Sequence, residues 1–170
     1  MNSNKNLVLI GMMGSGKSII GSLLSENLNL EFNDVDKIIE KEAGFKVSEI
    51  FKKEGENYFR KLEEKVTLQL LKSQNTIVSL GGGGFINKNI RNLVLKNHLS
   101  FWLYWKNSTL INRIIKSKKR PIAFNSSINE IKKIIIDRSK MYSMADFKVN
   151  CENLSKNEIV NKIKDIYEKN

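Results

Sequence analysis

Short apolar runs alternate along the chain with segments in which apolar residues recur at helical spacing. Runs such as Leu7 to Ile10 and Leu99 to Tyr104 are typical of short buried strands. Strands that alternate with helices predict a parallel sheet with helices on both of its faces. We therefore expect an α/β fold of three layers, α/β/α, built on a five-stranded parallel sheet. The predicted strands are residues 5–10, 31–33, 76–80, 99–104 and 147–150.

Helical periodicity and local capping residues place the helices between these strands. We expect one helix to end at Gly44, a C-terminal cap, and two others to begin at Ser108 and Ser155. Glu158 stands at the spacing of a capping box after Ser155. The predicted helices are residues 17–27, 34–43, 48–71 with a break near Gly55, 87–96, 108–116, 130–142 and from 155 onward.

One irregular segment interrupts this pattern. Residues 117–129 show no clean periodicity and contain the only proline, Pro121. Because the segment is also polar, we expect a mobile lid over about 116–129. No repeat, low-complexity tract or linker divides the rest of the chain, which predicts a single domain over residues 1–170.

Composition narrows the class of protein. The first apolar run is much too short for a signal-peptide core or a membrane span, which predicts a cytoplasmic protein without membrane contact. A single cysteine, Cys151, excludes an internal disulfide and a cysteine-rich zinc site. No apolar surface stripe stands out, so we expect a monomer.

Charge is distributed unevenly. The formal net charge is +11, yet residues 1–85 carry 11 basic and 11 acidic side chains, so the excess lies in residues 86–170. Such asymmetry fits nucleic-acid binding, small anionic ligands or a lysine-rich solvated face. Arginine is rare, and each arginine can mark a site that needs its planar fork of donors. The arginines are Arg60, Arg91, Arg113, Arg120 and Arg138.

The segment from Gly11 to Ser18 matches the pattern G-x-x-x-x-G-K-S. It follows a predicted strand and opens a helix, which is the context that phosphate binding requires. Glycines let backbone N–H groups turn toward phosphate, and the helix N-terminus adds a positive dipole end. Lys17 would reach the β- and γ-phosphates of ATP, and Ser18 would hold Mg²⁺. Kinases, GTPases, motors and helicases all use this loop, so it leaves the acceptor open.

Further motifs follow the phosphate-binding loop in a fixed order. They are D-x-D at Asp34 and Asp36, F-x-x-E-G-E-x-x-F-R ending at Arg60, glycines 81–84 after a strand, R-P at Arg120, and R-x-x-x-Y-x-x-A from Arg138. Taken in this order, the motifs resemble those of the shikimate kinase family over nearly the whole chain. The resemblance implies a P-loop kinase fold of the nucleoside-monophosphate-kinase-like type, with a mobile lid. It also implies phosphorylation of the shikimate 3-hydroxyl by ATP, giving 3-phosphoshikimate and ADP on the route to chorismate and the aromatic amino acids.

The resemblance also implies roles on the nucleotide side, with Mg²⁺ as cofactor and ATP as co-substrate. Asp34 would reach the metal through water, Arg113 would lie against adenine, and Arg120 would close from the lid onto the phosphates. Residues 151–155 would border the adenine, but this stretch is too variable to name a contact. The expected nucleotide-binding residues are Gly11, Gly14, Ser15, Gly16, Lys17, Ser18, Ile19, Arg113 and Arg120.

On the acceptor side, Asp36 would contact the substrate hydroxyls, and Arg60 and Arg138 would grip the carboxylate. Glycines 81–83 would let the backbone approach the ring; Gly84 is an extra member, and we favour Gly82 as the contact. Fork-shaped donors suit a carboxylate, and a carboxylate next to a hydroxyl can activate it. The expected catalytic residues are Lys17, Asp36 and Arg120. Whether Asp36 is a general base or only orients the hydroxyl stays open.

Departures from the family pattern are small. Ile19 follows Ser18 where threonine is common, and Ser22 stands where arginine is frequent; neither removes a group that the chemistry needs. His98 and the aromatic residues 101–105 are interpreted as structural. Two alternatives remain: a P-loop kinase for gluconate or a nucleotide, and a nucleic-acid-binding ATPase. The basic residues are mostly scattered lysines, so we expect shikimate and ATP as partners and no nucleic acid.

Overall fold

The computed structural model describes residues 5–117 and 126–170. Five parallel strands form one sheet in the order β2-β3-β1-β4-β5. This arrangement confirms the predicted α/β class and the five-stranded parallel sheet. The strands are β1 (Leu7–Ile10), β2 (Glu31–Asp34), β3 (Thr76–Ser79), β4 (Leu99–Tyr104) and β5 (Phe147–Asn150).

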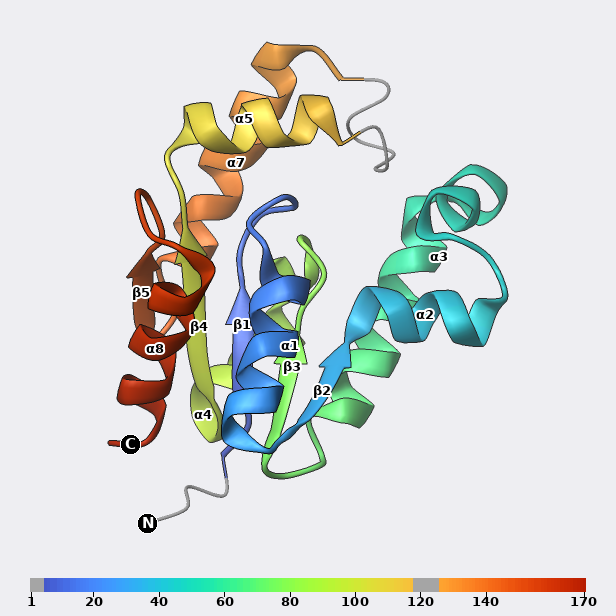
Figure 1. Cartoon of the computed structure of the whole chain (residues 1–170). Coiled ribbons are helices and arrows are strands. Elements are labelled where there is room, and N and C mark those ends of the chain that lie inside the picture. Colours follow the sequence, from blue (N-terminus) through green and yellow to red (C-terminus); the bar gives the residue numbers. More distant parts are fainter. Residues whose placement is uncertain (1–4, 118–125) are drawn as a thin grey trace.

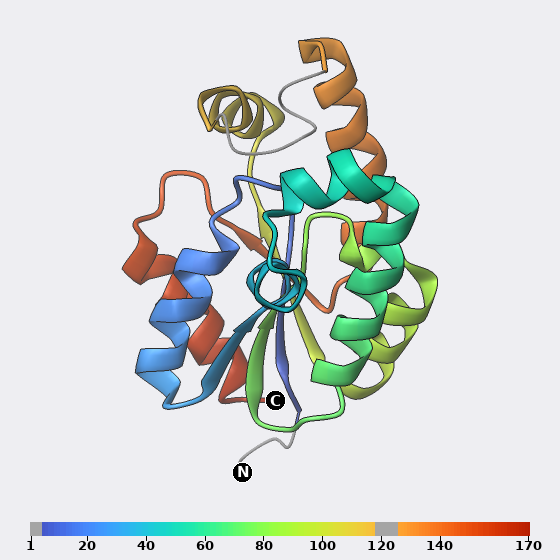
Figure 2. The ribbon, with the colours of Figure 1, turned by 90° about the vertical axis from the view of Figure 1, so that its right-hand side faces the viewer.

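Helices cover both faces of the sheet (Figures 1 and 2). On one face α1 (Lys17–Leu28) lies beside α8 (Lys156–Tyr167). The other face carries α4 (Lys88–Asn97) and the later part of α3 (Val47–Leu70), and α2 (Val35–Ala43) packs on α3.

The remaining helices lie beyond the carboxyl ends of the strands (Figure 1). These are α5 (Asn107–Lys116), α7 (Ile128–Tyr142) and the short 3₁₀ helix η1 (Gly84–Ile86). Because the loops that leave the strands converge at this edge, it is the expected place for a ligand in such a sheet.

The central strands are buried over their whole length. All residues of β1 and β3 are buried, whereas the edge strand β5 is partly exposed. Coverage on both faces explains why the central strands show continuous apolar runs rather than alternation. None of the helices in residues 5–117 and 126–170 has the length and apolar character of a membrane span.

Local signals predicted most helix ends. Gly44 caps α2 in the left-handed conformation, and Ser155 forms a capping box with Glu158 at the start of α8. Gly55 breaks α3 with φ 81° and ψ 171°, a conformation that only glycine adopts readily.

The predicted cap at Ser108 is wrong. Helix α5 starts one residue earlier, at Asn107, and the backbone N–H of Lys106 donates to the carboxylate of Glu152 over 2.9 Å. The stabilising group therefore comes from the loop after β5, which no local pattern can reveal.

The irregular segment is shorter than predicted at its carboxyl end. Ile128 and Asn129 belong to α7, because Ser127 and Glu130 form a capping box before them. Lys116, at the other end, is the last residue of α5. Arg120 and Pro121, the centre of the expected lid, lie outside the described residues.

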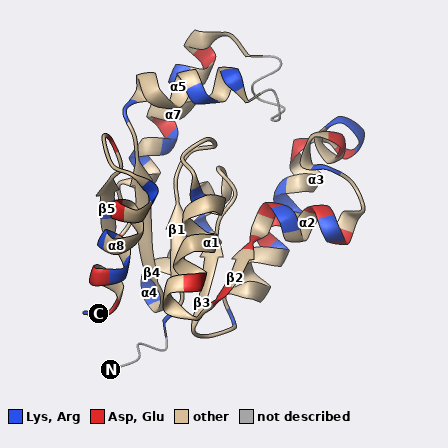
Figure 3. Ribbon diagram, viewed as in Figure 1, with Lys and Arg blue, Asp and Glu red and all other residues tan. Residues whose placement is uncertain are grey.

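Charged residues alternate in sign along several helices. In α2 and α3, Lys and Arg are interspersed with Asp and Glu (Figure 3). One such exposed pair joins Lys46 to Glu40 over 3.2 Å, and another joins Lys140 to Asp137 over 3.1 Å. Exposed pairs of this kind contribute little to stability.

Candidate active site

The phosphate-binding loop joins β1 to α1 and turns on two glycines. Gly14 has φ +78° and Gly16 has φ +92°, and Gly16 is the residue that precedes the first turn of α1. The ammonium of Lys17 folds back over the loop and donates to the carbonyls of Gly11 (2.8 Å) and Met12 (3.0 Å). A cation and a helix N-terminus thus face one hollow, which we call the loop hollow, as phosphate binding requires.

Ser15 adds a buried polar atom to this loop. Its side chain is 1% exposed, and its hydroxyl has no hydrogen-bond partner among the described residues. A buried polar group without a partner is costly unless a ligand or water completes it. A bound anion could accept a hydrogen bond from this hydroxyl, which fits a phosphate-binding role for the loop.

Ser18 and Asp34 meet beside the loop. The Ser18 hydroxyl donates to Asp34 Oδ2 over 2.5 Å, although the two residues come from α1 and from the end of β2. Both offer the hard oxygen ligands that Mg²⁺ prefers. No cluster of three or more His, Cys, Asp or Glu side chains gathers in residues 5–117 and 126–170. The pair fits a Mg²⁺ ion that takes its other ligands from phosphate and water.

A second hollow lies on the outer side of the loop, toward β4 and β5. The guanidinium of Arg113 lies 3.7 Å from the centre of the Trp105 ring and donates to the Gly14 carbonyl over 3.3 Å. Trp105 itself donates from Nε1 to the carbonyl of Ser15 over 2.9 Å. We call this the base-side hollow; it is lined by Gly14, Ser15, Gly16, Ile19, Ile20, Trp105, Arg113, Leu154, Ser155, Lys156 and Ile159.

Sequence reasoning missed Trp105, which was interpreted as core or sheet edge. The missed signal is its position directly after β4, at the carboxyl edge of the sheet where ligands bind. The structure also identifies Leu154 and Ser155 as the residues of the variable 151–155 stretch that line this hollow.

A third hollow gathers the predicted acceptor residues on the other side of the loop. Asp36, Arg60, Gly82, Gly83 and Arg138 all line it, although they are far apart in the sequence. Gly81 lies against its wall, because a Cβ atom there would be 2.8 Å from Asp36 Oδ1. The other lining residues are Met13, Val47, Phe51, Phe59 and Glu63.

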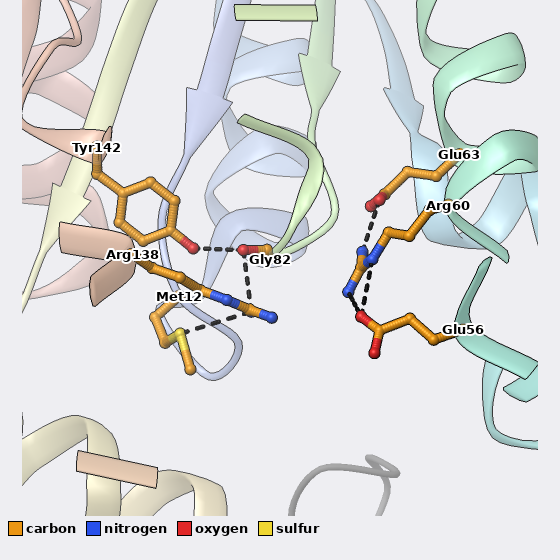
Figure 4. Close-up of polar contacts among 7 residues, drawn as sticks. All are labelled: Met12, Glu56, Arg60, Glu63, Gly82, Arg138 and Tyr142. Atoms are coloured by element: carbon orange, nitrogen blue, oxygen red, sulfur yellow. Dashed lines mark hydrogen bonds and ion pairs between the residues drawn. The ribbon is translucent and has the colours of Figure 1, made fainter. Parts of the chain in front are cut away.

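Two glutamates hold Arg60 in place at this pocket (Figure 4). Glu63 Oε2 accepts from Arg60 Nη1 over 2.6 Å, and Glu56 Oε1 accepts from Arg60 Nη2 over 3.0 Å. Burial raises the pKa of the Glu63 carboxyl, and the charge of Arg60 opposes that rise. Since Glu63 is 2% exposed, its ion pair fixes the guanidinium at the pocket wall. The sequence motifs assigned no role to Glu63.

Arg138 and Tyr142 converge on one backbone carbonyl (Figure 4). Arg138 Nη1 donates to the oxygen of Gly82 over 3.0 Å, and the Tyr142 hydroxyl donates to the same oxygen. Tyr142 is 1% exposed, and burial raises its pKa to about 12, so it keeps the proton that it donates. A side chain at Gly82 would place Cβ 3.2 Å from Arg138 Nη1 and 3.3 Å from the Met13 nitrogen, which explains the glycine.

The geometry thus unites most of the predicted residues in three adjoining hollows around the phosphate-binding loop. Gly11 and Gly81 are not among the lining residues, and Arg120 lies outside the described residues. Phe51 and Phe59 line the acceptor pocket, with their ring centres 4.7 Å apart. His98 and Cys151 line none of the three hollows, and both are buried.

Known proteins resemble this chain over nearly all of its length. The family model described as shikimate kinase matches residues 13–168. The shikimate kinase of Sulfurihydrogenibium sp. is 38% identical over 159 residues, which cover 94% of this chain and 95% of the relative. The shikimate kinase of Bacillus subtilis is 39% identical over 165 residues, which cover 94% and 87%.

Solved structures agree with these relatives. The shikimate kinase of Acinetobacter baumannii in complex with shikimate superposes with a TM-score of 0.89 at 26% identity, covering 99% of this chain and 95% of that one. The shikimate kinase of Aquifex aeolicus gives a TM-score of 0.86 at 38% identity, covering 96% of each chain. A gluconokinase of Sinorhizobium meliloti shares only the fold, with a TM-score of 0.56 at 13% identity. The chain belongs to the shikimate kinase family.

Proposed function

We propose that the chain transfers the γ-phosphoryl group of ATP to the 3-hydroxyl of shikimate, giving 3-phosphoshikimate and ADP. The observation that carries this proposal is the pocket beside the phosphate-binding loop, where Arg60, Arg138 and Asp36 meet. A bond forms between the hydroxyl oxygen and the γ-phosphorus, and the bond to the β–γ bridging oxygen breaks. The electron pair of the broken bond stays on the bridging oxygen, which leaves as part of ADP. The hydroxyl gives up its proton.

The two arginines supply the binding energy for the acceptor's carboxylate. Both present guanidinium groups at the same pocket, and each is held by a fixed partner, Glu63 for Arg60 and the Gly82 carbonyl for Arg138. Planar forks bind a carboxylate through paired hydrogen bonds, which fixes its orientation as well as its position. The arginines therefore set the acceptor ring in one pose, with its hydroxyls away from the clamp.

Asp36 is the residue that would meet the reacting hydroxyl. It lines both the acceptor pocket and the hollow around the phosphate-binding loop, which also contains Lys17 and Ser18. A carboxylate shared by the two hollows can hold the hydroxyl oxygen in line with the γ-phosphorus and accept its proton. Proximity to the loop makes Asp36 the link between the two substrates.

The phosphate-binding loop would hold the triphosphate while charge moves onto it. Lys17 exchanges the carbonyls of Gly11 and Met12 for phosphate oxygens, and the amides at the start of α1 add their dipoles. Ser18 and Asp34 would hold Mg²⁺, whose charge offsets that of the phosphates. These groups stabilise the bridging oxygen as it becomes part of ADP.

The choice of acceptor is tested by an ADP-release assay coupled to a spectroscopic readout. Shikimate, gluconate and nucleoside monophosphates are compared at equal concentrations, with ATP and Mg²⁺ in excess. We expect rapid turnover with shikimate and little with the others. The shikimate ring holds its carboxylate and hydroxyls in a fixed arrangement, whereas gluconate is a flexible open chain and a nucleoside monophosphate has no carboxylate. Faster turnover with gluconate or a nucleotide would contradict the proposal, as would ATP hydrolysis stimulated by nucleic acid alone.

We also propose that the enzyme acts as a monomer in the cytoplasm.

A further inference from the structure

We propose that Trp105 is a positioning residue of the nucleotide site: it holds a peptide of the phosphate-binding loop and the guanidinium of Arg113 in the orientations that nucleotide binding needs. The proposal rests on the proposed binding of ATP at this loop. It adds to that function a side chain that none of the loop's sequence motifs includes.

The first contact of Trp105 fixes one peptide plane of the loop. Its indole N–H donates to the carbonyl of Ser15 over 2.9 Å, in a position where the side chain is only 9% exposed. The carbonyl of Ser15 and the N–H of Gly16 belong to the same planar trans peptide, so they point in opposite directions. When Trp105 holds the carbonyl outward, it turns the Gly16 N–H the other way, toward the mouth of α1 where anions bind.

The second contact fixes a cation beside the loop. The guanidinium of Arg113 lies 3.7 Å from the centre of the Trp105 ring, and its Nη1 also donates to the Gly14 carbonyl. An arginine held by a ring and a carbonyl loses most of the freedom that an exposed arginine has. Both residues line the same largely apolar hollow, with Ile19 and Leu154. A flat guanidinium at the wall of this hollow can stack on a planar, neutral base through a cation–π interaction, which requires no hydrogen bonds to the edge of the base.

The backbone around Trp105 is tied to the loop after β5, whose later residues Leu154 and Ser155 line the same hollow. The carbonyl of Tyr104 accepts from the N–H of Cys151 over 2.9 Å, and the N–H of Lys106 donates to Glu152. Trp105 therefore stands between the phosphate-binding loop on one side and the loop after β5 on the other. A residue in this position can align the base site with the phosphate site.

Two substitutions separate the contributions of Trp105. Trp105→Phe keeps a ring for Arg113 but removes the indole N–H, and Trp105→Leu removes both. We expect Trp105→Phe to weaken ADP binding about threefold to tenfold, the scale of one hydrogen bond. Trp105→Leu should weaken it on the order of tenfold to a hundredfold, since the stacking partner is lost as well. Calorimetric titration with ADP measures both values, and each variant's fold is checked by circular dichroism.

Steady-state kinetics distinguish positioning from general damage. The KM for ATP should rise in both variants while the KM for shikimate stays at the wild-type value. Trp102→Phe is the matched control, because it makes the same chemical change in β4, at a buried tryptophan that lines neither the base-side hollow nor the loop hollow. It should leave ADP affinity unchanged. Since the chain has two tryptophans, it also leaves Trp105 as the sole indole fluorophore, whose emission should change when ADP binds.

Several outcomes would overturn the proposal. One is a folded Trp105→Leu protein that binds ADP as tightly as the wild type; another is an equal rise of both KM values. A third is an emission in Trp102→Phe that does not respond to saturating ADP. If Trp105→Leu does not fold, Trp105→Phe decides by the same measurements. ADP binding requires no acceptor. A failure to phosphorylate shikimate would therefore refute the proposed function, while the ADP titrations of the Trp105 variants would still test the role of Trp105.

Discussion

The phosphate-binding loop and the acceptor pocket share one edge of the sheet but are built on different principles. The loop uses consecutive residues from Gly11 to Ser18, and much of its chemistry lies in backbone atoms positioned by glycines and a helix end. The acceptor pocket uses side chains from separate helices and loops, held by ion pairs and carbonyls. A site made from contiguous backbone can be identified in a sequence, whereas one made from distant side chains depends on the whole fold.

The two regions also differ in how they carry charge. In the loop, Lys17 donates to two neutral carbonyls, which phosphate oxygens can replace. In the pocket, Arg60 is paired with the buried Glu63, so removal of Arg60 leaves a buried carboxylate without its partner. Substitutions in the loop should therefore affect the reaction rate, while those in the pocket should affect binding and, at Arg60, stability too.

Lys17→Ala tests the loop and should have the largest effect. We expect kcat to fall on the order of 10³- to 10⁵-fold, the range for a single cation at the transferring phosphates. The unfolding temperature should change little, since water can satisfy the two carbonyls to which Lys17 donates. Coupled ADP release measures the rate, and Lys41→Ala, at an exposed lysine of α2, is the control. Turnover near the wild-type level would remove Lys17 from the reaction.

Asp36→Asn tests the boundary between the two regions, because Asp36 lines both. If Asp36 accepts the proton, kcat should fall by roughly 10²- to 10⁴-fold, the range for a general base. If it only orients the hydroxyl, the loss should be smaller and appear mainly in the KM for shikimate. Both constants are measured beside Asp165→Asn, an exposed aspartate of α8. Wild-type values for both constants would exclude Asp36 from the site.

Arg60→Lys and Arg138→Lys test the carboxylate clamp. Lysine keeps the charge and loses the fork, so each substitution should cost on the order of 1–3 kcal/mol of shikimate binding, about tenfold to a hundredfold in KM. The KM for ATP should stay unchanged. Arg91→Lys is the matched control, because Arg91 binds the carbonyls of Phe85 and Ile86 and does not line the pocket. An unchanged KM for shikimate in both clamp variants would refute the assignment.

Tyr142→Phe should have the smallest effect. The ring still fills its buried site, and only the hydroxyl bond to the Gly82 carbonyl is lost. We expect the KM for shikimate to rise about threefold to tenfold, with ATP unaffected, because one hydrogen bond no longer orients that peptide. Tyr167→Phe, which removes a hydroxyl bond to the Lys5 carbonyl far from the pocket, is the control. A pocket that tolerates Tyr142→Phe would show that Arg138 alone fixes the Gly82 peptide.

These differences explain what the sequence could and could not predict. The strands, the phosphate-binding loop and the capping box at Ser155 depend on neighbouring residues, so local patterns identified them. The capping box of Ser127 and Glu130 is equally local, but it was missed because residues 117–129 were interpreted as one irregular segment. The cap at Ser108 failed because the group that stabilises this helix end, Glu152, comes from a different loop. The parts played by Glu63, Tyr142 and Trp105 also depend on tertiary contacts, which periodicity and spacing do not encode.

The order of the strands has a consequence for how such an enzyme can change over evolutionary time. With β1 in the middle of β2-β3-β1-β4-β5, the segments after β2 and β3 line the acceptor pocket and those after β4 and β5 line the base-side hollow. Arg138, from α7, is the exception that joins the acceptor group. With the roles proposed above, mutations on one flank would alter nucleotide preference while the other flank keeps its acceptor. The sheet gives natural selection two nearly independent sets of residues on which to act.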